Sequence, residues 1–369
     1  MTPKTDTDIT PIKIRAPQIK LLERLCNACA VSGDEGEVRA IVLEQVRPLA
    51  DDIKVDALGN VLVTRKGKSR RRKRLRVMLD AHMDEVGFML THDDGKGIFR
   101  FEPVGGLDVR QLAGKAVWVG RDHVPGVIGA KPIHLVKSSE LNHAIPLDTL
   151  RIDIGPGSET KVKVGDTAAF ATPYARLGPS LRAKALDDRL GVATLIELLK
   201  LAPPDIDILA AFTVQEEVGL RGAKVAAYAL EPDIAIALDC TPALDLPIWE
   251  DDDDAPSENT AYNTRLGAGP AIYTADRATL SDPRLVRMLV ETAQDLELPF
   301  QFRQPGGGGT DAGAIHLARA GIPSVSVSVP GRYIHTAASI VRISDWQHTL
   351  TLIHAALSRM TPRILAQDR

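Results

Sequence analysis

The sequence predicts an α/β protein with an open, mostly parallel sheet flanked by helices, into which an all-β domain is inserted. Two observations predict this fold class. After residue 178, short apolar runs typical of buried strands alternate with helical segments, which favours a parallel sheet. Between residues 85 and 177 the chain has only short alternating runs rich in Gly and Val, which are typical of a β module of six strands. We therefore expect a discontinuous α/β domain, residues 1–84 and 178–369, interrupted by a β-rich domain, residues 85–177.

The N-terminal part of the chain has the patterns of two amphipathic helices, a strand pair and a buried strand. Ser32 and Glu35 have the spacing of a capping box, which predicts that the second helix begins here. A Gly-Asn pair inside an alternating apolar pattern predicts a hairpin turn. The four elements are expected, in this order, at residues 17–32, 35–50, 53–67 and 75–82.

The C-terminal part alternates between helix and strand. Apolar residues at helical spacing predict helices at residues 187–202, 220–230, 282–296 and 310–321. Short and continuous apolar runs predict strands buried on both faces at residues 205–214, 233–240 and 323–329. The strand at residues 75–82 is expected to pair with these, so that the β-rich domain lies between two parts of one sheet.

Composition and charge are those of an ordinary globular protein, with 44% hydrophobic and 25% charged residues. The net charge of −3 gives no support for a nucleic-acid partner. The basic run at residues 69–76 precedes an apolar strand, so a solvated turn is favoured over a nucleic-acid patch. No segment has the pattern of a signal peptide or the length of a membrane span. We expect a cytoplasmic protein with no membrane partner.

Cys26 and Cys29 form a CxxC motif with three possible explanations. A redox CxxC lies at a helix N-terminus after a strand, whereas this pair falls late in an expected helix. A structural zinc site needs two further ligands, and no second CxxC supplies them. We therefore expect two thiols buried in the core and a reducing compartment.

Two adjacent carboxylates, Glu216 and Glu217, follow the strand expected at residues 205–214. Neighbouring negative charges repel each other unless a positive group lies between or beside them. Open parallel sheets place functional groups at the carboxyl ends of their strands. Further polar side chains stand at expected strand ends or at the start of a helix, namely His82, Asp84, Asp187, Asp188, Asp239 and His335.

Two imidazoles and several carboxylates at one sheet edge suit a pair of divalent ions. One of the two glutamates would bind metal and its neighbour would act as a general base. Asp84 would hold the second ring nitrogen of His82. Taken singly, each residue has a structural explanation, such as a helix N-cap for Asp187 and Asp188.

Other chemistries have little support in the sequence. No GxSxG nucleophile elbow, no GxGxxG motif and no complete P-loop occurs. The run GGGGT at residues 306–310 is consistent with an anion site or a tight turn. The acidic tract at residues 250–259 is interpreted as an exposed loop, with a bias toward basic substrates as the alternative.

The segments DAHMDEVGF, RFEPVGGLD, GVIGAKPIH, KALDDRLG, VQEEVGLRGA, IALDCT, GGTDAGAIH and PGRYIHT occur in this order between residues 18 and 355. They resemble the tetrahedral aminopeptidase family of dinuclear metallopeptidases, which includes deblocking and glutamyl aminopeptidases. The resemblance implies a catalytic α/β domain interrupted by a β-rich domain used for dimerisation. It also implies a homo-oligomer, either a dimer or a tetrahedral dodecamer.

The resemblance also assigns roles to single residues. It implies that Asp187 bridges two divalent metal ions, that Glu216 is the general base and that Asp84 is the partner of His82. The peptide bond after Asp187 is expected to be cis. Zinc is the expected metal, with cobalt or manganese as alternatives. The implied metal ligands are His82, Asp187, Glu217, Asp239 and His335.

The sequence therefore predicts an aminopeptidase that removes N-terminal residues from peptides through a metal-bridging hydroxide and a glutamate base. Three alternatives remain open. The same site would serve a deacylase of small N-acyl amino acids. A glycoside hydrolase needs two carboxyl groups free to flank a sugar bond. A metal-free binding scaffold of the same fold would need none of the expected ligands.

Overall fold

The computed structural model describes residues 11–69, 74–139, 142–203, 205–248, 257–258, 264–303 and 308–369. Most of the acidic tract, four residues of the basic run and the first two glycines of GGGGT lie outside these ranges. Within the described part of the chain, no helix is long and apolar enough to span a membrane.

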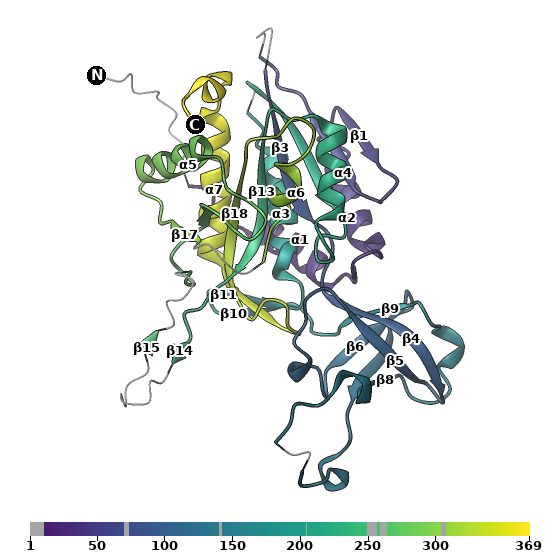
Figure 1. Ribbon diagram of the computed structural model, residues 1–369. Coiled ribbons are helices and arrows are strands. Elements are labelled where there is room, and N and C mark those ends of the chain that lie inside the picture. Colours follow the sequence, from purple (N-terminus) through teal and green to yellow (C-terminus); the bar gives the residue numbers. More distant parts are fainter. Residues whose placement is uncertain are drawn as a thin grey trace.

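A large mixed sheet forms the centre of the molecule (Figure 1). Its four central strands are parallel and almost wholly buried, which explains why they are continuous apolar runs in the sequence. The carboxyl ends of these strands therefore meet at one edge. In their order across the sheet they are β12 (Ile206–Thr213), β3 (Leu75–His82), β13 (Ile234–Pro242) and β18 (Ser324–Arg332).

The flanking strands pair antiparallel, apart from one short parallel pair of β16 with β17, so the predicted mostly parallel sheet is correct only for the centre. Strands joined by a tight turn pair antiparallel. The predicted hairpin is confirmed as β1 (Asp52–Val55) and β2 (Val61–Arg65). The other flanking strands are β19 (Ser339–Arg342), β11 (Ser180–Ala183), β10 (Ala175–Leu177), β16 (Ala271–Tyr273) and β17 (Gln301–Arg303). A separate short pair is β14 (Pro247–Ile248) and β15 (Ser257–Glu258).

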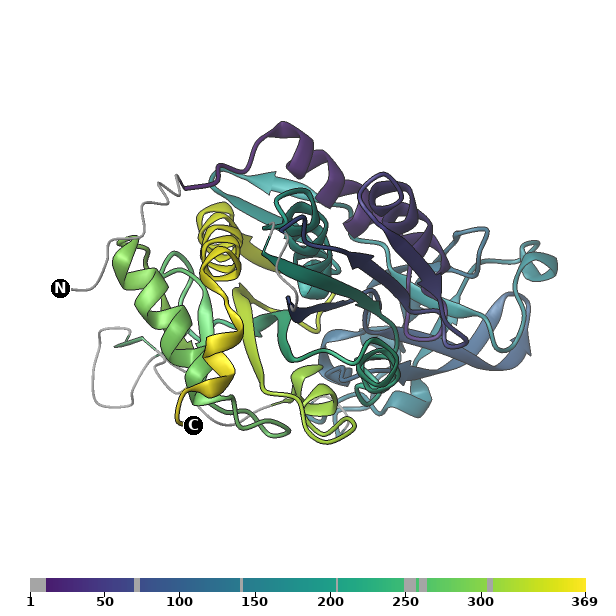
Figure 2. The ribbon, with the colours of Figure 1, turned by 90° about the horizontal axis from the view of Figure 1, so that it is seen from above.

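Helices cover both faces of the sheet, as Figure 2 shows from above. On β3, Val77 and Leu79 pack in the larger core with α1, α2, α3 and α7, whereas Met78 packs on the other face with α4 and α6. The described helices are α1 (Ala16–Asn27), α2 (Gly36–Val46), α3 (Leu186–Lys200), α4 (Arg221–Leu230), α5 (Pro283–Asp295), α6 (Ala312–Ile315) and α7 (Ile343–Arg359). Short 3₁₀ helices are η1 (Val109–Gln111), η2 (Ile133–Leu135), η3 (Leu147–Thr149), η4 (Glu159–Lys161) and η5 (Pro362–Ala366).

Six strands form a closed antiparallel barrel between β3 and β10, and six strands were predicted for this segment. In Figure 1 the barrel lies below the large sheet. Its core is aromatic, because Phe88 contacts Phe101 and Phe170 edge to face at centroid distances of 5.1 and 5.2 Å. The strands are β4 (Gly87–Gly95), β5 (Ile98–Val104), β6 (Ala116–Val119), β7 (Val124–Gly129), β8 (Arg151–Asp153) and β9 (Thr167–Phe170).

Three local predictions are wrong. The helix predicted for residues 310–321 is the single turn α6. The capping box does not form, because the Ser32 hydroxyl donates to Asp84 and Glu35 accepts from the backbone of Gly33. The first helix ends at Asn27, so Cys26 is buried as predicted but Cys29 lies beyond the helix and is only half-buried.

Candidate metal centre

The carboxyl edge of the central sheet gathers the polar side chains that were predicted to meet there. His82 is the last residue of β3, and Asp239 lies on β13 two strands from β12. Glu216 and Glu217 follow β12, and His335 follows β18. Because these strands are parallel neighbours, residues more than 250 positions apart in the sequence face one another.

Asp187, in the first turn of α3, lies between the two histidines. Its Oδ1 atom is 3.3 Å from His82 Nε2, and its Oδ2 atom is 3.5 Å from His335 Nε2. His82 Nε2 is 3.8 Å from Asp239 Oδ1, and His335 Nε2 is 3.3 Å from Glu217 Oε2. The donors thus form two groups of three, each close enough to surround one ion, and Asp187 belongs to both.

Asp187 and the adjacent Asp188 make different contacts. The Asp187–Asp188 peptide bond is cis, as the resemblance implies. Asp188 Oδ1 accepts a hydrogen bond from the Gly191 N–H at 2.9 Å, so this carboxylate bonds within its own helix. Cys240 also approaches Asp187, but its thiol donates to the Leu186 carbonyl at 3.2 Å. The two adjacent aspartates therefore have different surroundings.

Asp84 is a fixed acceptor behind His82. Its Oδ1 atom is 3.5 Å from His82 Nδ1 and accepts the Glu216 N–H at 3.0 Å. Its Oδ2 atom accepts the Ser32 hydroxyl at 2.6 Å and the Glu217 N–H at 3.2 Å. Burial opposes a charge on Asp84, but His82 and these donors outweigh it and lower its pKa. Asp84 thus links the imidazole to the turn that carries both glutamates.

Burial dominates the protonation of Glu216, Glu217 and Asp239. It raises the pKa of Glu217 to about 8 and that of Asp239 to about 7, although nearby histidines partly oppose the shift. The pKa of Glu216 lies well above its ordinary value because the side chain is buried, and Asp239 and Glu217 repel its charge. The site therefore concentrates negative groups that need a positive partner.

The two histidines are surrounded by carboxylates. Burial disfavours their charged forms, but Asp187 and its neighbours outweigh this effect. As a result the pKa of His335 rises to about 10, and that of His82 rises well above its ordinary value. Within the described residues, Asp187 Oδ1 is buried and has no hydrogen-bond partner, whereas His82 Nδ1, which also has none, faces Asp84 at 3.5 Å. Buried polar atoms rarely remain unpaired, so Asp187 Oδ1, with His82 Nε2 at 3.3 Å, fits a divalent cation.

A cavity of about 430 Å³ opens onto this edge. His82, Asp187, Asp239 and His335 line the cavity, and so does Glu216, which belongs to neither group of three. Tyr273, Arg303 and Ile334 also line it. A small peptide end can enter such a cavity and reach both the donors and Glu216.

The barrel reaches this site through the loop after β5. The Gly106 carbonyl lies 2.9 Å from His335 Nδ1, which leaves Nε2 facing Asp187 and Glu217. Gly105 has φ of +88°, and a Cβ atom there would lie 2.8 Å from Val86 Cγ1. A side chain at this position is therefore both strained and obstructed.

Sequence reasoning missed a buried charge network beneath the site. Glu85 accepts hydrogen bonds from Lys184 at 2.6 Å and from Arg189 at 3.0 Å. Arg189 also donates to the carbonyl oxygens of Met83 and Asp84. All three charged side chains are almost fully buried and paired, as buried charges must be. The sequence did contain a signal, because Glu85 lies in the segment DAHMDEVGF and both Lys184 and Arg189 lie in KALDDRLG, the same segments that supply the expected site residues.

Comparisons with known proteins agree over nearly the whole chain. The sequence profile of the M42 glutamyl aminopeptidase family matches residues 59–352. The lysyl aminopeptidase of Pyrococcus furiosus is 31% identical over 93% of this chain and 97% of its own length. A solved aminopeptidase structure from the archaeon Desulfurococcus kamchatkensis is 35% identical, with a TM-score of 0.86 over 95% of this chain and 96% of that one.

A second solved structure bears on assembly. The TET1 peptidase of Pyrococcus horikoshii is 32% identical and has a TM-score of 0.78 over 93% of this chain and all of its own. That protein can assemble into a tetrahedron or a large octahedral shell. The similarity extends through both the large sheet and the barrel, since it covers nearly all of each chain.

Proposed function

We propose a mechanism from the premise that this chain belongs to the M42 family of aminopeptidases and is therefore a peptide-hydrolysing enzyme. The protein removes N-terminal residues from peptides with two divalent metal ions held at the carboxyl edge of the sheet. The observation that carries this proposal is the position of Asp187, whose two oxygens face different histidines at 3.3 and 3.5 Å.

Five side chains would hold the metals. His82 and Asp239 would complete one site, Glu217 and His335 the other, and Asp187 would belong to both. Imidazole and carboxylate donors suit zinc, with cobalt or manganese as alternatives. When bound, such ions polarise a carbonyl group and lower the pKa of water toward neutrality. They would also supply the positive charge that offsets the repulsion between the two adjacent glutamates.

Glu216 is the general base in this proposal. It lines the cavity, it is in neither group of donors, and its backbone is held by Asp84 at 3.0 Å. Its carboxylate would take a proton from the attacking water and deliver it to the leaving amine. Asp84 would act through His82, because its carboxylate lies 3.5 Å from His82 Nδ1 and would orient the imidazole ring.

The two structural parts would have different tasks. Residues 1–84 and 178–369 would form the catalytic domain, and residues 85–177 would form an inserted dimerisation domain. The segment after β7 exposes Ile133 and Leu135, which are 72% and 60% accessible. Exposed apolar side chains of this size favour a protein partner, and a second copy of the chain fits the assembly of the TET1 peptidase. A dimer, or a tetrahedral dodecamer built from dimers, is the proposed assembly.

The proposed substrates are peptides with a free N-terminus, and the proposed location is the cytoplasm. The three cysteines Cys26, Cys29 and Cys240 are all free, which supports a reducing compartment. Glutamyl and lysyl side chains are both candidates for the N-terminal position of the substrate, since the matched family is named for glutamyl substrates and one relative for lysyl substrates.

The test is hydrolysis of leucyl, glutamyl and lysyl anilides by protein stripped with a chelator and then supplied with zinc, cobalt or manganese. We expect activity that returns only with metal, together with a preference among the three substrates. An N-acetyl amino acid serves as the control substrate. Cleavage of that control alone would favour the deacylase, and silence with metal shown to be bound would overturn the aminopeptidase.

A further inference from the structure

A second cluster of metal-binding side chains lies where the N-terminal helices meet the barrel. Cys29 follows α1, Glu37 is in the first turn of α2, and His123 is in the turn between β6 and β7. One donor atom from each residue lies within 4.8 Å of the other two. None of the three takes part in the proposed peptidase mechanism.

The carboxylate of Glu37 is fixed between its two partners. Its Oε2 atom accepts the Cys29 N–H at 2.9 Å, and its Oε1 atom lies 2.5 Å from His123 Nε2. The indole ring of Trp118 lies beside the imidazole, with ring centroids 6.4 Å apart. The two side chains of this pair are therefore oriented by contacts from the helix layer and from the barrel.

The thiol of Cys29 is a second observation, separate from the Glu37–His123 pair, that points to a bound ion. Within the residues that the structure describes, its sulfur atom makes no hydrogen bond, although it faces the Glu37–His123 pair. The other two thiols each have an acceptor, the Ala185 carbonyl for Cys26 at 3.9 Å and the Leu186 carbonyl for Cys240 at 3.2 Å. An ion pair between Glu37 and His123 does not by itself explain why the Cys29 sulfur atom lies within 4.8 Å of both side chains.

We propose that Cys29, Glu37 and His123 bind one zinc ion per chain, separate from the metals at the sheet edge. Thiolate, imidazole and carboxylate are the donors that zinc accepts in proteins, and four ligands in a tetrahedron are its usual number. A cavity of about 410 Å³ adjoins Cys29 and Glu37, so a water molecule has room to be the fourth ligand. Calcium and magnesium are disfavoured because they require mainly oxygen ligands.

The ion would join two parts of the molecule, the helix layer and the barrel. Cys29 and Glu37 belong to the helix layer, whereas His123 belongs to the barrel. A neighbouring contact of the same kind is the hydrogen bond from Thr167 on β9 to Asp34 at 3.0 Å. A metal bond across this junction would stabilise the orientation of the barrel relative to the large sheet.

The decisive experiment is anomalous diffraction from crystals of the full chain grown with micromolar zinc, measured above and below the zinc absorption edge. We expect a peak between Cys29 and His123 in addition to any peak near Asp187. Absence of that peak while the sheet edge is occupied would overturn the proposal, as would a peak only at millimolar zinc. The peak near Asp187 tests the proposed peptidase site, and the peak between Cys29 and His123 tests the second zinc site. The failure of one proposal is therefore distinguishable from the failure of the other.

A solution experiment keeps the proposal testable without crystals. Cobalt bound to a thiolate gives an absorption band in the near ultraviolet that carboxylate and imidazole ligands do not give. We expect Cys29→Ser to lose this band together with one metal equivalent per chain, and His123→Ala to weaken it. The matched control is Cys240→Ser, because Cys240 lies near the other metal site and must be excluded as the source. A band that persists in Cys29→Ser and vanishes in Cys240→Ser would overturn the assignment.

Discussion

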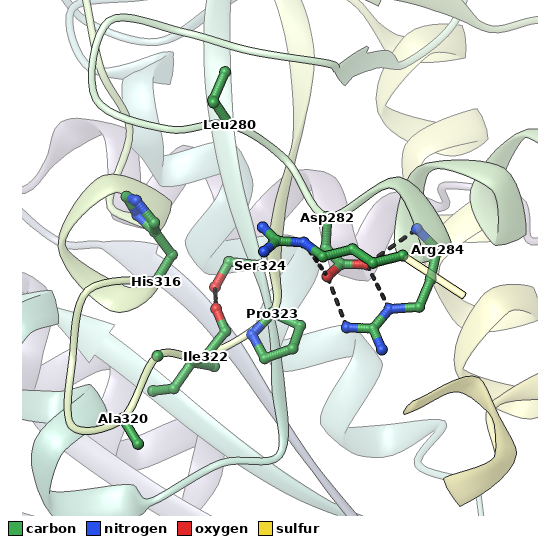
Figure 3. A pocket seen from close by; sticks show the side chains of 10 residues that line it. Leu280, Asp282, Arg284, His316, Ala320, Ile322, Pro323 and Ser324 are labelled. Carbon is green, nitrogen blue, oxygen red and sulfur yellow. Dashed lines mark hydrogen bonds and ion pairs between the residues drawn. The ribbon is translucent and has the colours of Figure 1, made fainter. Parts of the chain in front are cut away.

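Buried carboxyl groups at the two edges of the central sheet, Asp282 at one and Glu217 and Asp239 at the other, have pKa values shifted in opposite directions. At the amino end of β18, Figure 3 shows a cavity whose acidic side chain is Asp282, and its volume is about 340 Å³. Arg284 donates to both oxygens of Asp282, from Nε at 2.9 Å and from Nη2 at 2.8 Å. Despite burial, this arginine keeps the pKa of Asp282 below its ordinary value. The negative charge is compensated by a residue two positions further along the chain.

At the carboxyl edge the cavity is of similar size, about 430 Å³, but its acidic groups are not compensated in this way. Burial raises the pKa values of Glu217 and Asp239 to about 8 and 7, and it also raises the pKa of Glu216 well above its ordinary value. Carboxyl groups with such values are poorly stabilised as anions by the surrounding protein. The two cavities are similar in size, so size does not distinguish them. What indicates a metal centre is a cluster of buried carboxyl groups without an arginine or lysine, among the described residues, to neutralise them.

The largest effect is expected from a change that breaks the carboxyl edge itself. Asp187→Asn keeps the size of the side chain but removes the charge shared by the two groups of donors. We expect peptidase activity to fall to an undetectable level and the metal content to fall with it, because both sites lose a ligand. Hydrolysis of aminoacyl anilides and elemental analysis of the purified protein check this outcome. Full activity with two metals still bound would contradict the shared-ligand geometry.

A second change separates catalysis from metal binding. We expect Glu216→Gln to lower kcat by about 10²- to 10⁴-fold, the range ascribed to general acid–base catalysis, while the metal content stays the same. Steady-state kinetics and elemental analysis on the same sample provide the measurement. Glu217→Gln is the matched control, since it should lower both quantities. If the two variants lost metal equally, the distinction between base and ligand would be wrong.

The pH dependence of stability sharpens the comparison. In the metal-free protein, Glu217, Asp239 and His335 all have pKa values raised above those of an unfolded chain. The folded state therefore binds more protons than the unfolded state between about pH 4 and pH 10, and its stability falls as the pH rises through this window. Asp187, whose pKa is lowered, titrates below this window.

Thermal unfolding of chelated and metal-loaded protein from pH 5 to pH 9 measures this dependence. We expect the Tm of the chelated form to fall with rising pH and the metal-loaded form to be less sensitive, because the ions replace the protons. Glu217→Gln should reduce the slope of the chelated protein. Identical slopes for the two forms would show that the acidic cluster does not govern stability.

The smallest effect is expected at the amino edge. Asp282 also caps α5, since its Oδ1 atom accepts the Arg284 N–H at 3.0 Å. We expect Asp282→Ala to lower the free energy of unfolding by about 1–2 kcal/mol, the usual cost of losing an N-cap, and to leave activity unchanged. Asp282→Asn keeps a capping oxygen and should cost less. Denaturant unfolding gives the energies, and loss of peptidase activity would contradict the separation of the two edges.

Sequence patterns were sufficient for those elements whose environment is set by near neighbours in the chain. The apolar runs of the four central strands and the alternating pattern of the barrel predicted both parts of the fold. The same patterns failed for α6, where a helical period continues but the chain turns after Ile315. They also failed at Cys29, because the end of α1 at Asn27 is not evident from the local sequence.

By itself, the sequence determined which side chains stand at strand ends, and the resemblance to a known family assigned roles to them. Tertiary structure decided how they meet, with Asp187 between His82 and His335 and with Asp84 bound to the turn of the two glutamates. It also brought Cys29 to His123, which no spacing in the sequence indicates. The physical reason is that periodicity reports contacts within a few residues, whereas the meeting of distant residues depends on strand order and on how the barrel packs against the helices.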